Sequence, residues 1–555
     1  MTVSSISLPR RAIYFTLLIF LVIYLDFLFF PRTLEDAFIT FRYSKHLLQG
    51  YGLGAWNTCG EIVEGYTSFL WMILMSPAES LGITHATLSK IFGMATHLGL
   101  VLLCLTTSYF IHTKSIFKEF TYGKDRDVLF LTATILATYI PIAFYATSGM
   151  ETVAFSLLVL ACFLTPYFTD RISINIFIAI LTVIMRPEGV LVAMACGFYH
   201  LLRQKKEGQN IKNSIAGLSA AILVTSALMI SRKFMFGEWL PNTYYAKAGS
   251  AGLMHWNIGW DYISHWIQNH PIWVVLYVIV LGITIRNWIK RGFYSQLSPL
   301  FLLTFTLGYS LYIIKVGGDN HWAFPAWRHV IHMMPLLALL ISYGFVTLLK
   351  FSRSLTYAAV ILSVIFTNYK IVNIRYSTLL TGDFYTGLST FPNLKNSTHS
   401  PYYYFIKNIS ESNTVIASLL GGELPFVVDA IHIDMLGLND KFIAHNGTFD
   451  PEGPIDSKTD LNYILAQQPD IIEGYLSGNK ILQAIDLKDI ITGRRKLVME
   501  MIKHPIFQLE YMFLENGPYN DIDRALFLHR SFWENHPQRD SLQCIPITVT
   551  CLNRP

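Results

Sequence analysis

Long apolar runs separated by short polar segments fill the first two thirds of the chain. Two half-length runs, 172–185 and 189–202, flank Arg186-Pro187-Glu188-Gly189, so we expect two short helices that meet at a break. The apolar segment 68–82 is too short to span, which favours an interfacial or re-entrant position. Runs long enough to cross a bilayer lie near 12–30, 88–112, 128–147, 151–168, 213–233, 271–286, 296–315, 330–349 and 355–374. With the two half-length runs, this pattern predicts about eleven crossings.

The pattern changes at about residue 377, where Asn, Asp, Pro and Gly become frequent and no later run is long enough to span. Short stretches at 414–417, 426–429 and 469–472 have the composition of strands. We therefore expect a polytopic α-helical membrane domain at 1–376. A smaller α/β domain outside the membrane should follow at 377–555.

Composition supports a membrane protein and excludes several other classes. Charged residues make up 14% of the chain, against about 25% in ordinary soluble proteins, and 52% of residues are hydrophobic. Such a chain cannot cover a water-facing surface, so most of it must contact lipid. The formal charge of +5 is small for 555 residues and favours no nucleic-acid partner.

The basic residues between the apolar runs predict the orientation. If the N-terminus is cytoplasmic, the inner loops carry most of the Lys and Arg residues, as the positive-inside rule expects. No small-residue cleavage site follows the first run, so we interpret it as an anchor rather than a signal peptide. The C-terminal domain then lies on the outer side of the membrane.

In this topology the polar clusters gather on the outer side. Glu35 and Asp36 follow the first run, and one of them could act as a general base, although two acids also suit a helix N-terminus. Arg186 and Glu188 lie near membrane depth, where they either pair structurally or line a substrate cavity. The other polar candidates on this side are Arg42, Tyr43, Glu64, Tyr66, Glu151, Asn242, Tyr244, Tyr245, Lys247, Asp319 and Arg328.

Each cluster alone has an ordinary structural explanation, but together they place acids, tyrosines and cations from several segments on one face. This arrangement favours a site at the lipid boundary for a polyhydroxylated substrate with an anionic group. It fits a membrane glycosyltransferase that uses a lipid-phosphate sugar. The alternatives are a transporter or flippase of a lipid-linked sugar, which needs a polar path to the inner side, and an envelope scaffold, which needs no such cluster.

A series of motifs carries a more specific resemblance. They are Glu35–Tyr43, Val63–Trp71, Arg186–Gly189, Leu240–Lys247, Gly317–Asp319 and Ile433–Asp440. In this order they resemble the bacterial GT-C glycosyltransferases related to the mycobacterial terminal β-(1→2) arabinofuranosyltransferase. Glu35 stands where that family usually has a first aspartate, and His46 replaces a usual asparagine.

The resemblance implies a GT-C fold, a polyprenyl-phosphate sugar donor (decaprenyl-phosphoryl arabinose in mycobacteria) and a cell-envelope glycan acceptor. It also implies transfer on the outer face of the inner membrane, with the C-terminal domain in the periplasm. Asp36 matches the essential acid and would be the base, with Glu35 either holding the geometry or tuning the pKa of Asp36. No cofactor is required, although a divalent cation could bind near these two acids. Arg328, Arg186 and Lys247 are the candidates for the donor phosphate. The candidates for sugar contacts are Arg42, Tyr43, Glu64, Tyr66, Glu151, Glu188, Asn242, Tyr244, Tyr245 and Asp319. Whether transfer inverts or retains the anomeric configuration stays open.

Overall fold

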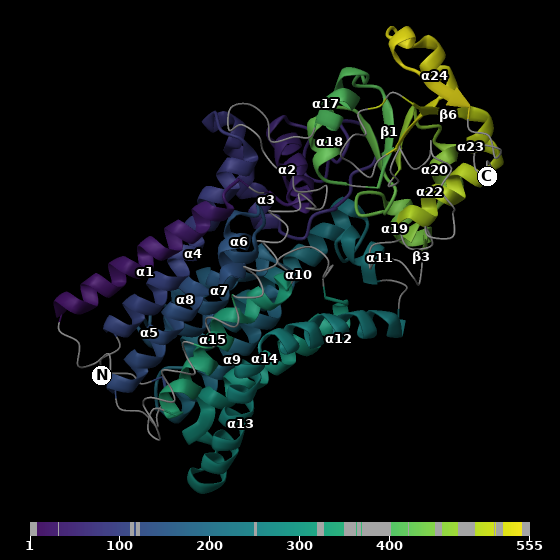
Figure 1. Ribbon diagram of the computed structural model, residues 1–555. Coiled ribbons are helices and arrows are strands. Elements are labelled where there is room, and N and C mark those ends of the chain that lie inside the picture. The colour runs from purple at the N-terminus through teal and green to yellow at the C-terminus, as the bar shows by residue number, and fades with distance from the viewer. Residues whose placement is uncertain are drawn as a thin grey trace.

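The computed structural model has a helical bundle capped at one end by a smaller unit that contains a β-sheet (Figure 1). It describes residues 8–31, 33–110, 116–117, 122–248, 252–318, 327–348, 362, 368, 401–419, 421–449, 458–474, 494–515, 517 and 525–546. The predicted span 355–374 therefore lies almost wholly outside the described residues, as does Asp319.

The apolar runs form helices close to the predicted bounds. The helices of the bundle are α1 (Leu8–Phe29), α4 (His85–Phe110), α5 (Tyr122–Thr138), α6 (Ile140–Thr147), α7 (Thr152–Leu164), α8 (Ile172–Met185), α9 (Gly189–Lys206), α10 (Lys212–Phe236), α13 (Pro271–Arg291), α14 (Leu297–Val316) and α15 (Arg328–Leu348). Shorter or flanking helices are α2 (Glu35–Leu48), α3 (Phe69–Met75), η2 (Ser76–Leu81), α11 (Asn242–Ala248) and α12 (Gly252–Asn269).

Six of these helices are long and apolar enough to cross a membrane, and α5 with α6 makes a seventh, bent by 59°. Pro141, which cannot donate a backbone hydrogen bond, lies at the start of α6 and accounts for the bend. Asn368 bridges the break, because its amide donates to Thr138 O and its Oδ1 accepts from Ile140 N. The chain is thus a multi-pass membrane protein. Over the described residues, six or seven spans meet this test where about eleven crossings were expected, and α7 and α8 are shorter apolar helices.

Helix α15 forms the centre of the bundle. Every residue from Arg328 to Thr347 is buried, as expected for a helix surrounded by α5, α7, α13 and α14. Pro335 interrupts its hydrogen bonding, because proline has no N–H to donate to Ile331 O. The hydroxyl of Ser156 on α7 donates to that carbonyl at 2.8 Å. The pair shows how a neighbouring helix satisfies a backbone group that the sequence leaves open inside a membrane domain.

The C-terminal part contains a mixed six-stranded sheet in the order β2-β1-β5-β7-β6-β8. Strand β1 pairs in parallel with β2 and β5, and the remaining pairs are antiparallel. The strands are β1 (Val415–Ser418), β2 (Ile431–Asp434), β5 (Ile471–Gly474), β6 (Tyr511–Leu514), β7 (Ala525–His529) and β8 (Cys544–Pro546), with β3 (Thr448–Phe449) and β4 (Lys458–Thr459) paired separately. The helices of this part are α17 (Pro401–Asn408), α18 (Glu423–Val427), α19 (Lys441–Asn446), α20 (Leu461–Ala466), α22 (Arg494–Lys503), α23 (Pro505–Glu510) and α24 (Arg530–Asn535).

The strand predictions hold at β1 and β5, but the one for 426–429 is wrong. Residues Glu423–Val427 form α18, and the next strand begins only at Ile431. Pro425 explains the difference, because it cannot donate to a neighbouring strand but is tolerated in the first turn of a helix. Residues 252–269, expected in an outer loop, form α12 with Tyr262 and Trp266 buried on one face.

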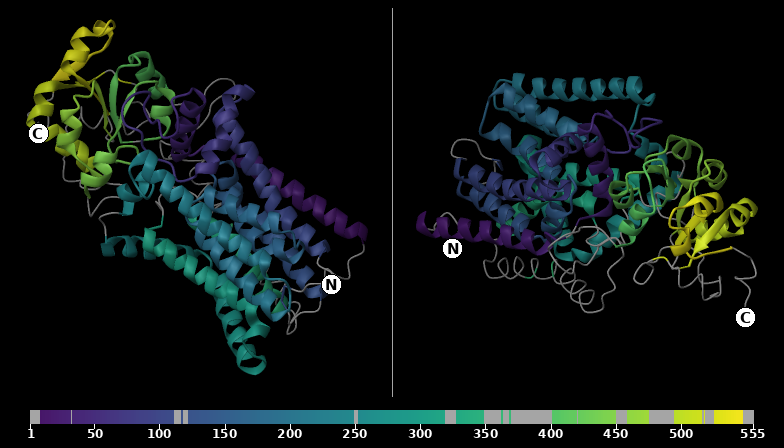
Figure 2. Two further views of the ribbon diagram at one scale, coloured as in Figure 1. Left: turned by 180° about the vertical axis from the view of Figure 1, so that it is seen from behind. Right: turned by 90° about the horizontal axis from the view of Figure 1, so that it is seen from above.

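Helix α2 joins the bundle to the sheet-containing part (Figures 1 and 2). Its Arg42 is buried and donates to three carbonyls, those of Trp56, Pro425 and Ala430. Two of these lie more than 380 residues away in the chain. Burial lowers the pKa of Arg42 to about 10, so the guanidinium is still charged at neutral pH. Arg42 therefore contributes three hydrogen bonds at the base of this junction, two of them from α2 to the C-terminal part.

Arg42→Met should lower the free energy of unfolding by about 2–4 kcal/mol, because buried carbonyls lose their donor. The thermal unfolding midpoint in detergent measures the effect. Lys45→Met is the matched control from the same helix. Its pair with Asp429 (2.7 Å) has one largely exposed partner and should contribute under about 1 kcal/mol. Equal shifts for the two variants would contradict this role for Arg42.

Candidate functional site

Asp36 lies in the first turn of α2, at the end of the bundle that faces the sheet. Its side chain is 51% exposed, and its Oδ2 lies 3.6 Å from Nη1 of Arg328. Arg328 is buried at the start of α15, and the same Nη1 lies 3.2 Å from the sulfur of Met150. An accessible carboxylate thus stands beside a cation whose position is fixed by the bundle.

The carboxylate of Glu35 binds the backbone at the start of α18 rather than Arg328. Its Oε1 accepts from the backbone N–H groups of Gly422 at 2.6 Å and of Glu423 at 3.3 Å, at the start of α18. The approach is so close that a Cβ on Gly422 would lie 2.2 Å from the Glu35 carbonyl oxygen. Glu35 therefore positions α2 against α18.

The turn between α6 and α7 fixes the other side of α2. Gly149 has φ +94°, and a Cβ there would lie 2.7 Å from Cβ of Ala37 on α2. The indole of Trp71 donates to Gly149 O at 3.0 Å, and Leu34 N donates to Ser148 O at 2.8 Å. These contacts hold the turn, and with it the next two residues, Met150 and Glu151, near the start of α2.

Arg186 occupies the expected break between α8 and α9. It is buried, its Nε donates to Glu188 Oε1 at 2.5 Å, and its Nη1 pairs with Glu151. Two carboxylates already offset its charge. The pairing of Arg186 with Glu188 corresponds to the structural alternative for this motif, whereas Arg328 faces an exposed carboxylate at 3.6 Å.

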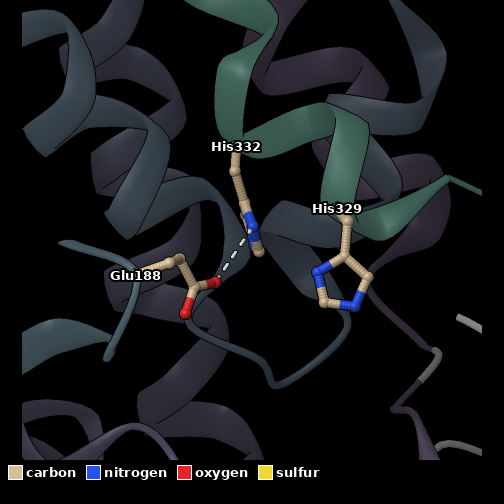
Figure 3. Close-up of side chains that lie close together, drawn as sticks. All are labelled: Glu188, His329 and His332. Carbon is tan, nitrogen blue, oxygen red and sulfur yellow. Dashed lines mark ion pairs between the residues drawn. The ribbon is translucent and has the colours of Figure 1, made fainter. Parts of the chain in front are cut away.

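Two histidines of α15 complete this group (Figure 3). His332 Nδ1 lies 3.6 Å from Glu188 Oε1 and 3.2 Å from the hydroxyl of Tyr309 on α14. His329 lies one turn earlier on the same helix. Atoms of Glu188, His329 and His332 come within 4.8 Å of one another, so the three residues could hold a metal ion. Within the described ranges, the residues that could hold a metal ion are these three. The sequence had instead suggested a cation near Glu35 and Asp36.

Several predicted sugar-binding residues lie at the junction of the two parts instead. Glu64 Oε2 accepts from Arg232 Nε at 2.7 Å, and burial raises the pKa of Glu64 while Arg232 opposes the shift. Asn242 donates to the carbonyls of Gly437 and Leu438 at 2.8 and 3.0 Å. Tyr43 donates to Asn439 Oδ1 at 3.0 Å. The contacts of Asn242 and Tyr43 hold the 433–440 segment against the bundle, whereas Glu64 is paired with α10.

Two aspartates accept backbone hydrogen bonds within the 433–440 segment and at the helix that follows it. Asp434 accepts from the N–H groups of Leu436 and Asn439, and Asp440 caps α19 through Ile443 N at 2.9 Å. The two aspartates therefore stabilise the turn and the start of α19. Burial raises the pKa of Asp434 to about 6.

The remaining candidates, Tyr66, Tyr244, Tyr245 and Lys247, make other contacts. Tyr66 is buried with its ring centroid 4.9 Å from that of Tyr43. On α11, Tyr244 is 49% exposed, Tyr245 packs on His445 with ring centroids 4.5 Å apart, and Lys247 is half-buried. The exposed tyrosine has the accessibility that a substrate contact requires.

Sequence reasoning missed the pair His329 and His332, although the spacing His-x-x-His was visible. Residues three apart on a helix share one face, so this spacing was a usable signal once α15 was expected there. Arg232 and Asn439 gave no such signal, because their partners Glu64 and Tyr43 are remote in sequence.

Comparison with known proteins supports the resemblance that the motifs indicate. The chain is similar to the terminal β-(1→2)-arabinofuranosyltransferase of Corynebacterium glutamicum, with 27% identity over 113 residues. The match covers 18% of this chain and only 16% of the length of that protein. No family model matches the sequence.

Two solved structures have a broad likeness in fold to this chain. The oligosaccharyltransferase of Archaeoglobus fulgidus, in a complex with Zn and sulfate, has 10% identity and a TM-score of 0.49, covering 90% of this chain and 71% of that one. ArnT from Cupriavidus metallidurans, bound to undecaprenyl phosphate, has 9% identity and a TM-score of 0.48, covering 94% and 98%.

Gly149→Ala should destabilise the protein more than Gly60→Ala, because only the first adds a clash. Both glycines have φ +94°, but a Cβ on Gly60 meets nothing within 4 Å. The shared backbone strain costs about 1–2 kcal/mol, and overpacking at Gly149 adds about 1–3 kcal/mol. Thermal unfolding of the two purified variants measures the difference. Indistinguishable midpoints would show that the turn does not press on α2.

Proposed function

We propose that this protein is an integral-membrane glycosyltransferase with a polyprenyl-phosphate sugar as donor and a cell-envelope glycan as acceptor. The observation that carries the proposal is the pair of Asp36 and Arg328, an accessible carboxylate 3.6 Å from a buried guanidinium at the end of the bundle. A base for the acceptor hydroxyl and a group that binds the phosphate are the two functions that this reaction needs.

Asp36 and the leaving phosphate account for the proton and the bonding electrons of this reaction. An acceptor hydroxyl attacks the anomeric carbon of the donor, and the bond from that carbon to the phosphate oxygen breaks. The polyprenyl phosphate leaves with the bonding electrons, while the hydroxyl proton passes to Asp36. Because the phosphate is a good leaving group, the protein contributes mainly positioning and charge stabilisation.

Arg328 is suited to the departing phosphate. Its guanidinium offers a planar set of donors, and it stands in the first turn of α15, where the helix dipole also favours an anion. Arg186 contributes indirectly in this proposal, because its charge is held by Glu151 and Glu188. Lys247 and Tyr244 on α11 are candidates for contacts farther along the substrate.

The two parts of the chain would have different roles in this reaction. Residues 1–376 would bind the donor and carry Asp36, and residues 377–555 would hold the acceptor glycan in the periplasm, with the N-terminus in the cytoplasm. The contacts of α2 with α18 support this, because they place the sheet-containing part directly beside Asp36. The positive-inside distribution of Lys and Arg supports the orientation.

Arabinofuranose is the sugar that we propose first. The support is the sequence similarity to the corynebacterial arabinofuranosyltransferase. A panel of radiolabelled polyprenyl-phosphate arabinose and hexose donors, incubated with purified protein and a glycan extract, identifies the sugar. Transfer from a hexose donor alone would replace arabinose in the proposal, and donor binding without any transfer would favour a flippase.

Asp36→Asn should reduce transfer by at least about 10²-fold, the contribution of a general base, because an amide cannot accept the proton. The rate of label incorporation into glycan measures this effect. Donor binding and thermal stability should stay near wild type, since the side chain is half exposed. Wild-type transfer by the variant would remove Asp36 from the mechanism.

Arg328→Met should weaken binding of the donor phosphate, and Arg328→Lys should retain part of it, because lysine keeps the charge but not the planar donor set. Equilibrium binding of polyprenyl phosphate to the three proteins in nanodiscs tests this order. Loss of a charge-assisted hydrogen bond predicts an affinity lower by about tenfold or more for Met. Equal affinity for all three proteins would contradict a phosphate site at Arg328.

A further inference from the structure

We propose that Glu188, His329 and His332 form a site for a zinc-type divalent cation, and that the ion's remaining coordination position takes an oxygen of the donor phosphate. The cation site stands on the geometry of the three side chains alone. The phosphate ligand rests on the proposed function.

The backbone brings the three ligands together from two directions (Figure 3). His329 and His332 are three residues apart on α15, which puts both rings on one face of the helix. Glu188 comes from the non-helical break before α9. One ligand atom from each lies within 4.8 Å of the other two. A tetrahedral zinc ion with bonds of about 2.0–2.1 Å needs ligand atoms about 3.3 Å apart, so small side-chain rotations close the site.

Burial makes these side chains suited to a bound ion. Glu188 and His329 are buried, and His332 is fully buried. The Nε2 atom of His332 makes no hydrogen bond with any residue in the part of the chain that the structure describes. A buried polar atom without a partner is costly, so a further ligand at this ring would be stabilising. The Tyr309 hydroxyl, 3.2 Å from Nδ1, orients the ring in the way that outer residues orient metal-binding histidines.

The charges around the site also accommodate a cation. Arg186 is the nearest basic group, and its Nε bonds to Glu188 Oε1. Glu151 binds the other side of that guanidinium, so the charge of Arg186 is shared by two carboxylates. With Arg328 next to His329, two carboxylates balance two guanidinium groups before an ion binds. The second oxygen of Glu188 is the natural ligand atom, because Oε1 is already engaged.

The ligand set determines the class of ion. Two imidazoles and one carboxylate favour zinc or a similar transition metal, whereas magnesium and calcium prefer oxygen ligands throughout. Three protein ligands leave a zinc ion with an open position. Arg328 immediately precedes His329 and approaches Asp36, so phosphate bound at Arg328 would lie next to the ion.

The test starts with chelator-treated protein in nanodiscs, loaded with one equivalent of ZnCl2 or MgCl2 and then desalted. Metal content is measured for wild type, His329→Gln, His332→Gln and His200→Gln. His200 is the matched control, because it is a buried histidine of α9 that bonds to Phe163 O, outside the group. Cobalt absorption of the wild-type protein gives a ligand-field signature that does not depend on any variant folding.

We expect wild type and His200→Gln to retain about one zinc per chain and little magnesium, and the other two variants to lose at least tenfold in zinc affinity. Removing zinc should weaken undecaprenyl phosphate binding by about tenfold. Zinc retained equally by all four proteins, or a cobalt spectrum of the hydrated ion, overturns the cation site. Stoichiometric zinc with unchanged phosphate affinity overturns the phosphate ligand only. Stoichiometric zinc in a protein that transfers no sugar leaves the metal site standing and rejects the proposed function instead.

Discussion

The packing of α2 between the bundle and the sheet-containing part is the constraint on which the candidate site depends. Glu35, in the first turn of α2, accepts hydrogen bonds from the first amides of α18. Gly149 packs against Ala37 of α2. Arg42, in the middle of α2, donates to the carbonyl of Pro425. A fourteen-residue helix has little stability of its own in water, so these contacts determine where it lies. Asp36 takes its position from them without having to form a strong bond itself.

The way in which charges are compensated separates Asp36 and Arg328 from the other polar residues at this end of the bundle. Arg186 is enclosed by two carboxylates, and Glu64 is buried against Arg232. Such pairs are already satisfied, so a substrate would have to break them before it could bind. The contact between Asp36 and Arg328 is longer, at 3.6 Å, and one partner is half exposed. In the proposed function, a substrate with a hydroxyl and a phosphate would therefore displace a weaker contact there.

The sequence predicted those features that local composition controls. Apolar runs gave the helices of the bundle, because a bilayer demands helices of a certain length, and the motif at Arg186 gave the break between α8 and α9. It failed where the partner is remote. Nothing near Glu35 indicates that its carboxylate binds Gly422, 387 residues away, and α12 lacks the long apolar run by which the other helices were found. The predicted sugar contacts Tyr43 and Asn242 likewise turned out to bond to the 433–440 segment.

These remote contacts give the adjacent acids Glu35 and Asp36 different tasks. Neighbouring residues of a helix point in directions about 100° apart, since 3.6 residues make one turn. One can therefore face the sheet-containing part while the other faces Arg328. If the C-terminal part holds the acceptor, the same turn of α2 that is fixed to it also presents the base. The distance between acceptor and base is then set within a single helical turn, and a short, doubly anchored helix can hold that distance although the two parts of the protein are far apart in sequence.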